Sequence, residues 1–382
     1  MVHEILKHIS PELGNLSGYI TVRAACALAF AFIMSLLTGP ACLRRLTVLK
    51  FGQQVRQFQT KETQQFNIHQ HKAGTPTMGG LIIILSTLTS VILFCAPTSV
   101  YVWVVVLVML GTGALGFADD YLKIVRRNHK GVSPWGKLAV QILIGAALGY
   151  FLWVNGARTS YVMRTATPAG VVSRIIPGNA HLLVPFFKNA YPYLGLALVF
   201  WAALVLTAAS NAVNLTDGLD GLAIGATITV ALPYLVITYL VSRMDYSGYL
   251  YLPHVPQAGE LSVVLSALLG AAMGFLWFNA HPAEIFMGDT GSLSLGAVIG
   301  TIALLCKHEI LLILIGGIFV IEALSVVLQV GSYKWRGKRI LLMSPLHNHF
   351  VKLGMHESKI IARFLIVSMI LALAGLSTLK LR

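Results

Sequence analysis

Carboxylates are scarce in this 382-residue sequence, and most of its aspartates gather in three short stretches. These stretches hold Asp119 and Asp120, then Asp217 and Asp220, then Asp289. Adjacent like charges are unfavourable unless a cation or a proton relieves them. The first pair therefore suggests a divalent metal site or a general base, and the alternative is a solvated helix end beside nearby Lys and Arg residues.

The second stretch repeats a polar residue at every third position: Asn211, Asn214, Asp217 and Asp220. That spacing keeps the four side chains near one face of a helix or tight turn. Such a row suits a metal, a ribose or a base. A calcium loop is the main competitor, but its ligands alternate and end in Glu, which is absent here. The alternative is a purely structural role, in which these side chains form a hydrogen-bonded cap between two helices.

The third stretch, residues 286–292, reads FMGDTGS and opens another apolar segment. Asp289 at that position has an ordinary explanation as a helix N-cap. An Asp flanked by Gly and hydroxyl groups also suits Mg²⁺, which takes one or two carboxylates and leaves positions for phosphate oxygens. Asn279 and Phe286, just before it, are suited to holding a polar ring.

Residues 72–80, KAGTPTMGG, place one ammonium group beside hydroxyls and unhindered backbone. Lys72 and Thr75 are therefore candidate phosphate contacts, although the stretch lacks Walker A spacing. The alternative for Lys72 is a topology determinant at the end of a membrane span.

His347 and His349 lie two residues apart in a polar loop, where they suit pyrophosphate binding or acid/base work. Zinc is the weaker interpretation, because no Cys or third His is near. Glu322 and Gln329 share one face of an apolar segment, and an ionisable residue inside a span is a functional candidate by default. Glu322 has the alternative of being protonated or bonded to a neighbouring helix.

The composition indicates which kind of fold holds these residues in place. Hydrophobic residues make up 56% of the chain and charged residues only 11%. Soluble proteins carry about a quarter charged residues, so a disordered, fibrous or ordinary cytosolic protein is excluded. The sequence predicts an all-α polytopic membrane protein, a single integral membrane domain over residues 1–382. The four cysteines lie far apart and indicate neither a zinc knuckle nor a disulfide framework.

A bilayer core needs about 20 apolar residues per helix. On that criterion we expect a bundle of about ten transmembrane helices, of which the eighth is the weakest because it is short and rich in Gly and Ser. The expected spans are 20–41, 77–95, 100–118, 135–154, 193–210, 221–241, 260–278, 290–306, 310–330 and 360–379.

Alternation of the spans puts five segments on one side of the membrane: 42–76, 119–134, 211–220, 279–289 and 331–359. Those segments carry 16 Lys and Arg, against 9 for the other side. The positive-inside rule makes them cytoplasmic and puts both termini outside. All five clustered aspartates then face the cytoplasm. Carboxylates, Mg²⁺ and basic groups at a membrane surface favour phosphoryl transfer with one lipid reactant.

Five motifs carry a resemblance to a known family. They are KAGTPTMGG at 72–80, GFADDY at 116–121, NAVNLTDGLDGLA at 211–223, FMGDTGS at 286–292 and PLHNHF at 345–350. From about residue 51 to the C-terminus, and in this order, the chain resembles bacterial phospho-N-acetylmuramoyl-pentapeptide transferases, members of the polyprenyl-phosphate N-acetylhexosamine-1-phosphate transferase superfamily.

The resemblance implies a ten-helix homodimeric enzyme of the bacterial cytoplasmic membrane, with its site facing the cytoplasm and no nucleic acid partner. It implies Mg²⁺-dependent transfer of phospho-MurNAc-pentapeptide from UDP-MurNAc-pentapeptide to undecaprenyl phosphate, giving lipid I and UMP. Asp289 would bind Mg²⁺, and Asp119, assisted by Asp120, would act as base or nucleophile toward the lipid phosphate. The uridine and sugar side would be lined by Asn214, Asp217, Asp220, Asn279 and Phe286, with Lys72, His347 and His349 near phosphates or substrate.

The sequence departs from the family pattern at one position, and two other functions share some of its features. Members of the family usually carry three consecutive histidines where this chain has His347, Asn348 and His349, so Asn348 receives no acid/base role. A related enzyme that transfers GlcNAc-1-phosphate shares the aspartate motifs, but the 72–80 and 278–286 stretches favour the muramoyl enzyme. A secondary transporter would place its site near mid-membrane instead.

Overall fold

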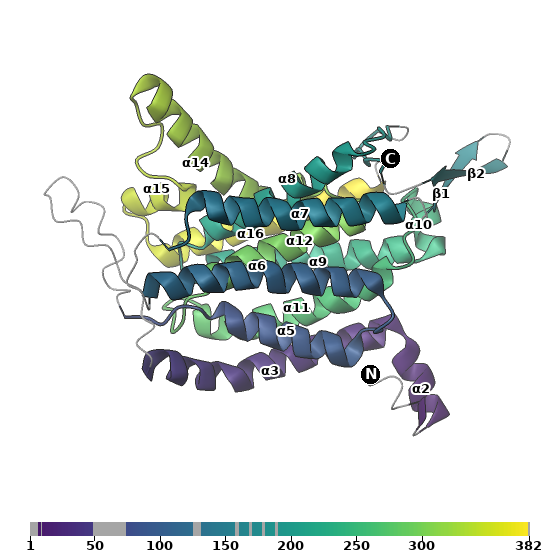
Figure 1. The fold of residues 1–382 in the computed structure, drawn as a ribbon, viewed down its shortest axis with the longest axis horizontal. Helices are drawn as coiled ribbons and strands as arrows, with labels where there is room; N and C mark the ends of the chain where they lie inside the picture. The colour runs from purple at the N-terminus through teal and green to yellow at the C-terminus, as the bar shows by residue number, and fades with distance from the viewer. Residues whose placement is uncertain are drawn as a thin grey trace, which may run out of the picture.

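The computed structural model describes residues 7–8, 10–48, 74–124, 131–156, 160–167, 170–177, 180–187 and 190–380. Among these residues, nine helices are long and apolar enough to cross a membrane, and a shorter apolar helix, α5, runs beside them. Figure 1 shows the long helices lying roughly side by side along one direction. The expected all-α, multi-pass membrane fold is confirmed. The side of the membrane on which each terminus lies stays a prediction.

The bundle is built from the following apolar helices: α3 (Ile20–Val48), α5 (Gly80–Phe94), α6 (Val100–Ile124), α7 (Pro134–Gly156), α8 (Ala197–Thr216), α9 (Leu222–Ser242), α11 (Ala258–Asn279), α12 (Gly288–Leu305), α14 (Gly317–Arg336) and α16 (Glu357–Ser377). Short helices connect or flank them: α2 (Pro11–Gly18), α10 (Met244–Leu250), α13 (Leu312–Ile315), α15 (Leu346–Lys352) and the 3₁₀ turn η2 (Thr378–Lys380).

Helices α11 and α12 form the centre of the bundle. Of their most apolar stretches, 83% and 89% are buried, against 17% for α3. Helix α11 packs against α3, α5 and α9, while α12 packs against α6 and α8. Lipid cannot drive apolar helices together by hydrophobicity, so close packing and interhelical hydrogen bonds matter more. Ser90 Oγ donates to the carbonyl of Ala27 (2.8 Å), and Ser35 Oγ to that of Ala271 (3.3 Å).

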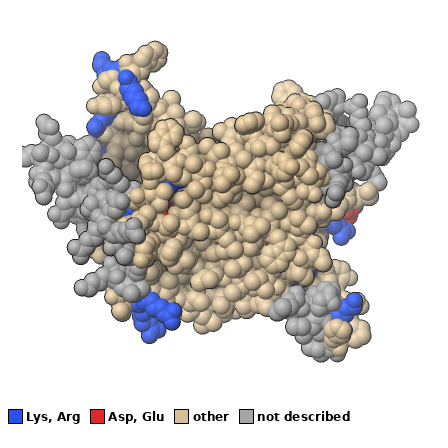
Figure 2. All heavy atoms as spheres, in the orientation of Figure 1, with Lys and Arg blue, Asp and Glu red and all other residues tan. Residues whose placement is uncertain are grey.

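The outer surface matches a bilayer environment. Large apolar side chains such as Leu107, Leu143 and Phe200 are exposed on the outside of the bundle. On the face shown in Figure 2, Lys and Arg lie mainly toward the two ends, and the body between them is almost free of charge. This is the distribution expected for helices that face lipid.

Two features differ from the sequence-based expectation. The predicted ninth span, 310–330, is broken at Gly316: α13 ends at Ile315, and α14 then runs to Arg336 and projects from the bundle (Figure 1). A two-stranded antiparallel hairpin, β1 (Ser160–Thr167) and β2 (Gly170–Pro177), occupies the long loop after α7, where no strand was expected. Neither feature changes the helical bundle that carries the site.

Candidate functional site

Three aspartates meet at one end of the bundle. Asp119 and Asp120 lie near the end of α6, and Asp289 lies in the first turn of α12. One carboxylate oxygen from each falls within 4.8 Å of the others. Asp119 and Asp120 are buried, whereas the Asp289 side chain is 16% exposed. Two motifs separated by almost 170 residues in sequence therefore form one cluster.

Close backbone contact between helices makes this cluster possible. A Cβ added to Gly116 of α6 would collide with the carbonyl oxygen of Asp289 in α12. A Cβ added to Gly80 of α5 would collide with the backbone nitrogen of Gly291. Small residues let helices approach closely in this way. The glycines of the 72–80, 116–121 and 286–292 motifs thus bring the carboxylates together.

Asp120 caps the N-terminus of α12. Its carboxylate accepts hydrogen bonds from the backbone N–H of Asp289 (3.2 Å) and from the N–H and hydroxyl of Thr290 (3.0 and 2.7 Å). The first N–H groups of a helix have no partner within the helix, so a carboxylate from outside satisfies them. The N-cap considered for Asp289 is in fact supplied by Asp120, which leaves the Asp289 carboxylate for other contacts.

Two lysines bridge Asp119 and Asp289. Lys123 Nζ lies 2.5 Å from Asp119 Oδ2 and 3.2 Å from Asp289 Oδ2. Lys137 Nζ, at the start of α7, lies 2.8 and 2.5 Å from the same two oxygens. Asp119 Oδ1 also accepts a hydrogen bond from the N–H of Val132 (2.8 Å). The two carboxylates are therefore held at a fixed separation by cations.

Neither lysine was among the candidate site residues. For Lys123 a signal was present, because it lies four residues after Asp119 and so on the same helix face. Lys137 offers no such signal: it is one lysine at the beginning of an apolar segment, and only the packing of α7 beside α6 brings it to the cluster.

Asn214 completes the Asp289 environment. Its Nδ2 donates to Asp289 Oδ1 (2.9 Å) and lies 2.8 Å from Ser292 Oγ. Asn211, one turn earlier on α8, points elsewhere: its Nδ2 donates to Gln141 Oε1 of α7 (2.8 Å). Although the two residues are three positions apart, they therefore act in different places. Asn214 lies at the aspartate cluster, and Asn211 makes a neighbouring polar contact between helices.

Asp217 and Asp220 follow the end of α8, in the short turn before α9. Asp217 is the C-cap residue directly after α8, which ends at Thr216. Asp220 is buried and accepts hydrogen bonds from His281 and from the N–H of Ala283. Both aspartates lie beyond the end of the helix that carries Asn214.

The loop before α12 is joined to its neighbours by Asn279 and by backbone pairing. Asn279 is buried, accepts from the N–H of Gly221 (3.1 Å) and donates to the carbonyl of Ile285 (2.8 Å). Phe286 is half-buried, and its backbone pairs with Pro76 and Gly79. The 72–80 motif therefore lies directly beside the loop that leads to Asp289. Thr75 is half-buried in that motif, while Lys72 lies outside the described residues.

Gln329 and His349, two further predicted site residues, form hydrogen bonds with the segment after α14. Gln329 accepts from the N–H groups of Ile340 and Leu341 and donates to the carbonyl of Leu341, so its amide fastens that segment. His349 Nδ1 accepts from the N–H of Leu342 (3.2 Å). Gln329 is therefore not brought to the aspartates by any of these contacts.

His347 is buried against Glu322. Glu322 accepts from the backbone N–H of His347 (3.1 Å) and from its Nδ1 (3.2 Å). A Cβ added to Gly218 would collide with Nε2 of His347, so the imidazole lies against the turn between α8 and α9. Glu322 was considered as a membrane-embedded candidate, and the structure pairs it with His347.

The aspartate cluster suits a divalent cation. Three carboxylates are gathered in partly buried surroundings, and the positions between Asp119 and Asp289 already accept positive groups, the two ammonium ions. Oxygen-only donors suit Mg²⁺, which binds through one or two carboxylates and keeps positions for substrate oxygens. Bridging lysines and carboxylates at a membrane surface are also suited to neutralising phosphate groups.

Comparison with known proteins identifies the family of this chain. Residues 102–307, more than half of the chain, match the family described as glycosyl transferase family 4, and residues 72–84 match signature 1 of the phospho-N-acetylmuramoyl-pentapeptide-transferases. The chain is 44% identical over 385 residues to the phospho-N-acetylmuramoyl-pentapeptide-transferase of Citrifermentans bemidjiense, covering 100% of both. It is 45% identical to those of Pelobacter propionicus (97% of this chain, 96% of the relative) and Maridesulfovibrio salexigens (100% of each). The chain belongs to the phospho-N-acetylmuramoyl-pentapeptide-transferase family.

Proposed function

We propose that this protein transfers phospho-MurNAc-pentapeptide from UDP-MurNAc-pentapeptide to undecaprenyl phosphate, forming lipid I and UMP in the first membrane step of peptidoglycan synthesis. The observation that carries the proposal is the cluster of three aspartates and two lysines, in a chain that belongs to this family. A GlcNAc-1-phosphate transferase is disfavoured by the match at residues 72–84.

The reaction exchanges one phosphorus–oxygen bond for another. An oxygen of the lipid phosphate attacks the phosphorus that bears the sugar, the bond to the UMP oxygen breaks, and UMP leaves with the bonding electrons. Asp119 accepts the proton that a singly protonated lipid phosphate carries, which is a general-base role. Lys123 and Lys137, which contact both Asp119 and Asp289, offset the negative charge of the two phosphate groups.

Mg²⁺ is part of the proposal, and Asp289 is its protein ligand. Asp120 holds the first turn of α12, and Asn214 holds Asp289 Oδ1, so the carboxylate is oriented before any ion binds. When bound, Mg²⁺ would neutralise phosphate oxygens and orient the leaving group.

Contacts that link the loops around Asp220, Asn279 and Phe286 support the proposed donor side of the site. We place the uridine and sugar against Asn214, Asp217, Asp220, Asn279 and Phe286, with Lys72, Thr75 and His349 near the phosphates. Asn211, Gln329 and His347 belong to the same proposed substrate-binding set. Their hydrogen bonds to Gln141, the 340–341 backbone and Glu322 hold these side chains in place.

An apolar cavity supports a lipid acceptor. It measures about 330 Å³ and lies between α8, α12 and α14. Its walls are almost entirely apolar, with Trp201, Leu204, Phe319 and Leu324 among them, and it reaches Val213. Val213 directly precedes Asn214, which binds Asp289. A polyprenyl chain in this cavity would bring its phosphate toward the aspartate cluster.

The orientation and assembly of the enzyme belong to the same proposal. The excess of Lys and Arg on the segments that carry the cluster supports a site facing the cytoplasm, in the inner membrane of a bacterium. Assembly as a homodimer rests on the family resemblance. Light scattering of the purified protein in detergent tests it, and a monomeric mass would contradict it.

The donor comparison tests the function. Purified protein with Mg²⁺ and undecaprenyl phosphate is expected to release UMP from UDP-MurNAc-pentapeptide and not from UDP-GlcNAc. UMP release from UDP-GlcNAc alone would contradict the substrate assignment and favour the related GlcNAc-1-phosphate transferase.

A further inference from the structure

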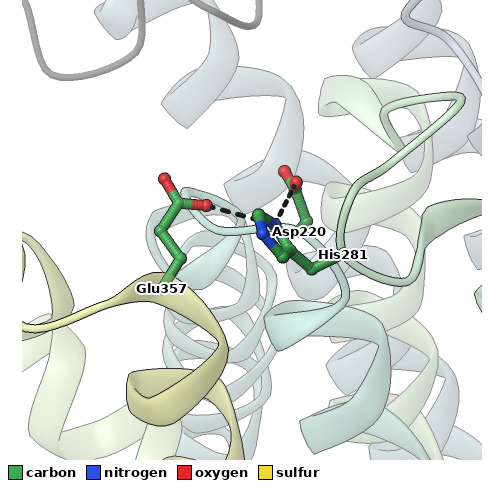
Figure 3. Close-up of side chains that lie close together, drawn as sticks. All are labelled: Asp220, His281 and Glu357. Atoms are coloured by element: carbon green, nitrogen blue, oxygen red, sulfur yellow. Dashed lines mark hydrogen bonds and ion pairs between the residues drawn. The ribbon is translucent and has the colours of Figure 1, made fainter.

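A second group of ionisable side chains lies beside the loop that leads to Asp289. It consists of Asp220 in the turn after α8, His281 in the loop between α11 and α12, and Glu357 in the first turn of α16. His281 Nδ1 lies 3.0 Å from Asp220 Oδ2 and 3.6 Å from Glu357 Oε2. Figure 3 shows the imidazole between the two carboxylates. One side chain thus connects three segments that are distant in the sequence.

The contacts of Asp220 fix the direction of its carboxylate. Oδ2 accepts hydrogen bonds from both His281 Nδ1 (3.0 Å) and the N–H of Ala283 (3.2 Å). Asp220 is 4% exposed, so little water competes for these bonds. Two donors from the same loop on one oxygen restrict rotation of the carboxylate, because turning it would break both bonds.

Glu357 extends the connection to α16. It is buried at the start of that helix, and its carboxylate lies 3.6 Å from Nδ1 of His281, the same nitrogen that contacts Asp220 (Figure 3). His356, the N-cap residue of α16, packs its ring edge-on against His281, with ring centroids 5.9 Å apart. The loop that carries His281 is therefore fastened to a transmembrane helix, which gives it a rigid support.

The same loop is fastened on its other sides. Asn279 joins it to Gly221, the residue directly after Asp220. Backbone hydrogen bonds at Phe286 join it to the 72–80 motif. Among these contacts, His281 is the side chain of the loop that binds both Asp220 and Glu357.

We propose that His281 is a positioning residue, which together with Glu357 fixes Asp220 and so determines the affinity for the nucleotide part of the donor. The inference deepens the proposed function and rests on it, because Asp220 is placed there on the uridine side. His281 itself is not placed in contact with substrate. Its effect is transmitted through the orientation of Asp220.

The aspartate cluster is held by different contacts. Asp119 and Asp289 are bound by Lys123, Lys137 and Asn214, and none of these contacts involves His281, Glu357 or Asp220. Loss of His281 is therefore expected to weaken donor binding while leaving the chemical step nearly intact. In kinetic terms the KM for UDP-MurNAc-pentapeptide rises and kcat changes little.

Four variants test the inference. His281→Ala removes both contacts. His281→Asn keeps a side-chain N–H near the position of Nδ1. Glu357→Gln keeps the shape of Glu357 without its charge. His254→Ala is the matched control, because His254 lies outside the site and, among the described residues, its ring bonds to the carbonyl of Ser242. UMP release is measured against donor concentration at saturating undecaprenyl phosphate, and UMP binding is measured by calorimetry.

For His281→Ala, the donor KM and the dissociation constant of UMP are expected to rise about tenfold, the effect of losing one partly buried hydrogen bond to a charged group. The kcat is expected to stay within about threefold of wild type. His281→Asn should recover part of this loss, Glu357→Gln should show a smaller rise, and His254→Ala should match wild type.

Unchanged KM and UMP affinity in His281→Ala would overturn the inference, as would a fall in kcat with KM unchanged. If His281→Ala does not fold, His281→Asn and Glu357→Gln decide the matter by the same two constants. Failure of the proposed function is distinguishable, because the wild-type protein would then release no UMP from UDP-MurNAc-pentapeptide, whatever the variants do.

Discussion

Replacing Gly116 by Ala adds a single methyl group at the contact between α6 and α12. That methyl would overlap the carbonyl oxygen and carbonyl carbon of Asp289 and crowd the Cα of Thr290. All three are backbone atoms near the start of a helix, so no side-chain rotation relieves the collision. The two helices must move apart, and the hydrogen bonds from Asp289 and Thr290 to Asp120 must lengthen.

The size of the effect follows from these contacts. Overpacking of a close-packed interior costs about 1–3 kcal/mol. The larger effect is expected on the rate, because a displacement of about 1 Å between catalytic groups costs on the order of 100-fold. Gly116→Ala is therefore expected to lower kcat by about two orders of magnitude, with a modest loss of thermal stability.

UMP release and thermal unfolding are measured on the same detergent-solubilised preparation. Gly331→Ala is the matched control, because it makes the same change on α14 at a position with nothing within 4 Å of the added Cβ. Alanine is favoured over glycine in a helix by roughly 0.5–1 kcal/mol, so this control should be unchanged or slightly stabilised. Wild-type kcat in Gly116→Ala would refute the claim that backbone contact between α6 and α12 sets the cluster geometry.

The remaining predictions concern the ionisable groups. Lys137→Met should lower kcat by roughly 100-fold, because it removes a bridging cation of the kind that stabilises a transferring phosphate group. Lys334→Met, at the exposed end of α14, is the control and should match wild type. Equal activity of the two variants would exclude Lys137 from the site. Chelation by EDTA should abolish UMP release and added Mg²⁺ should restore it, and full Mg²⁺-dependent turnover in Asp289→Asn would remove Asp289 from the metal site. Glu322→Ala should lower the free energy of unfolding by about 1–3 kcal/mol, because His347 loses two buried hydrogen bonds, and an unchanged melting temperature would contradict that pairing. Arg23→Met should destabilise the fold by about 1–3 kcal/mol, because Glu260 loses a partly buried ion pair with contacts of 2.6 and 2.9 Å, while kcat per folded molecule stays the same. A loss of kcat without destabilisation would count against a purely structural role.

Much of the fold was predictable, because each membrane span corresponds to a long apolar segment of the sequence. The described helices follow the expected spans with shifts of a few residues at most ends. The break at Gly316 was not predictable from hydropathy, since the residues on both sides are equally apolar. The hairpin of β1 and β2 was not predictable from hydropathy either, because the length of an apolar segment carries no information about the loop that follows it.

The site was predictable in its carboxylates and less so in its partners. Asp119, Asp120 and Asp289 stood out because acidic residues are rare in this chain, and the structure brings them together. Spacing could not show that Asp120 caps α12, because that contact joins two motifs far apart in sequence. It also could not show that Asn211 turns to Gln141 whereas Asn214 turns to Asp289. Those choices depend on how α7, α8 and α12 pack.

The fate of the sugar-bearing phosphorus tests the central claim most directly. UDP-MurNAc-pentapeptide carrying ³²P in the phosphate attached to the sugar is incubated with the protein, Mg²⁺ and undecaprenyl phosphate, and lipid and aqueous products are separated. The label is expected in the lipid product, with unlabelled UMP as the only nucleotide formed. Label that stays in the aqueous phase as UDP would show cleavage of the sugar–oxygen bond, and would contradict transfer of a phosphorylated sugar by this site.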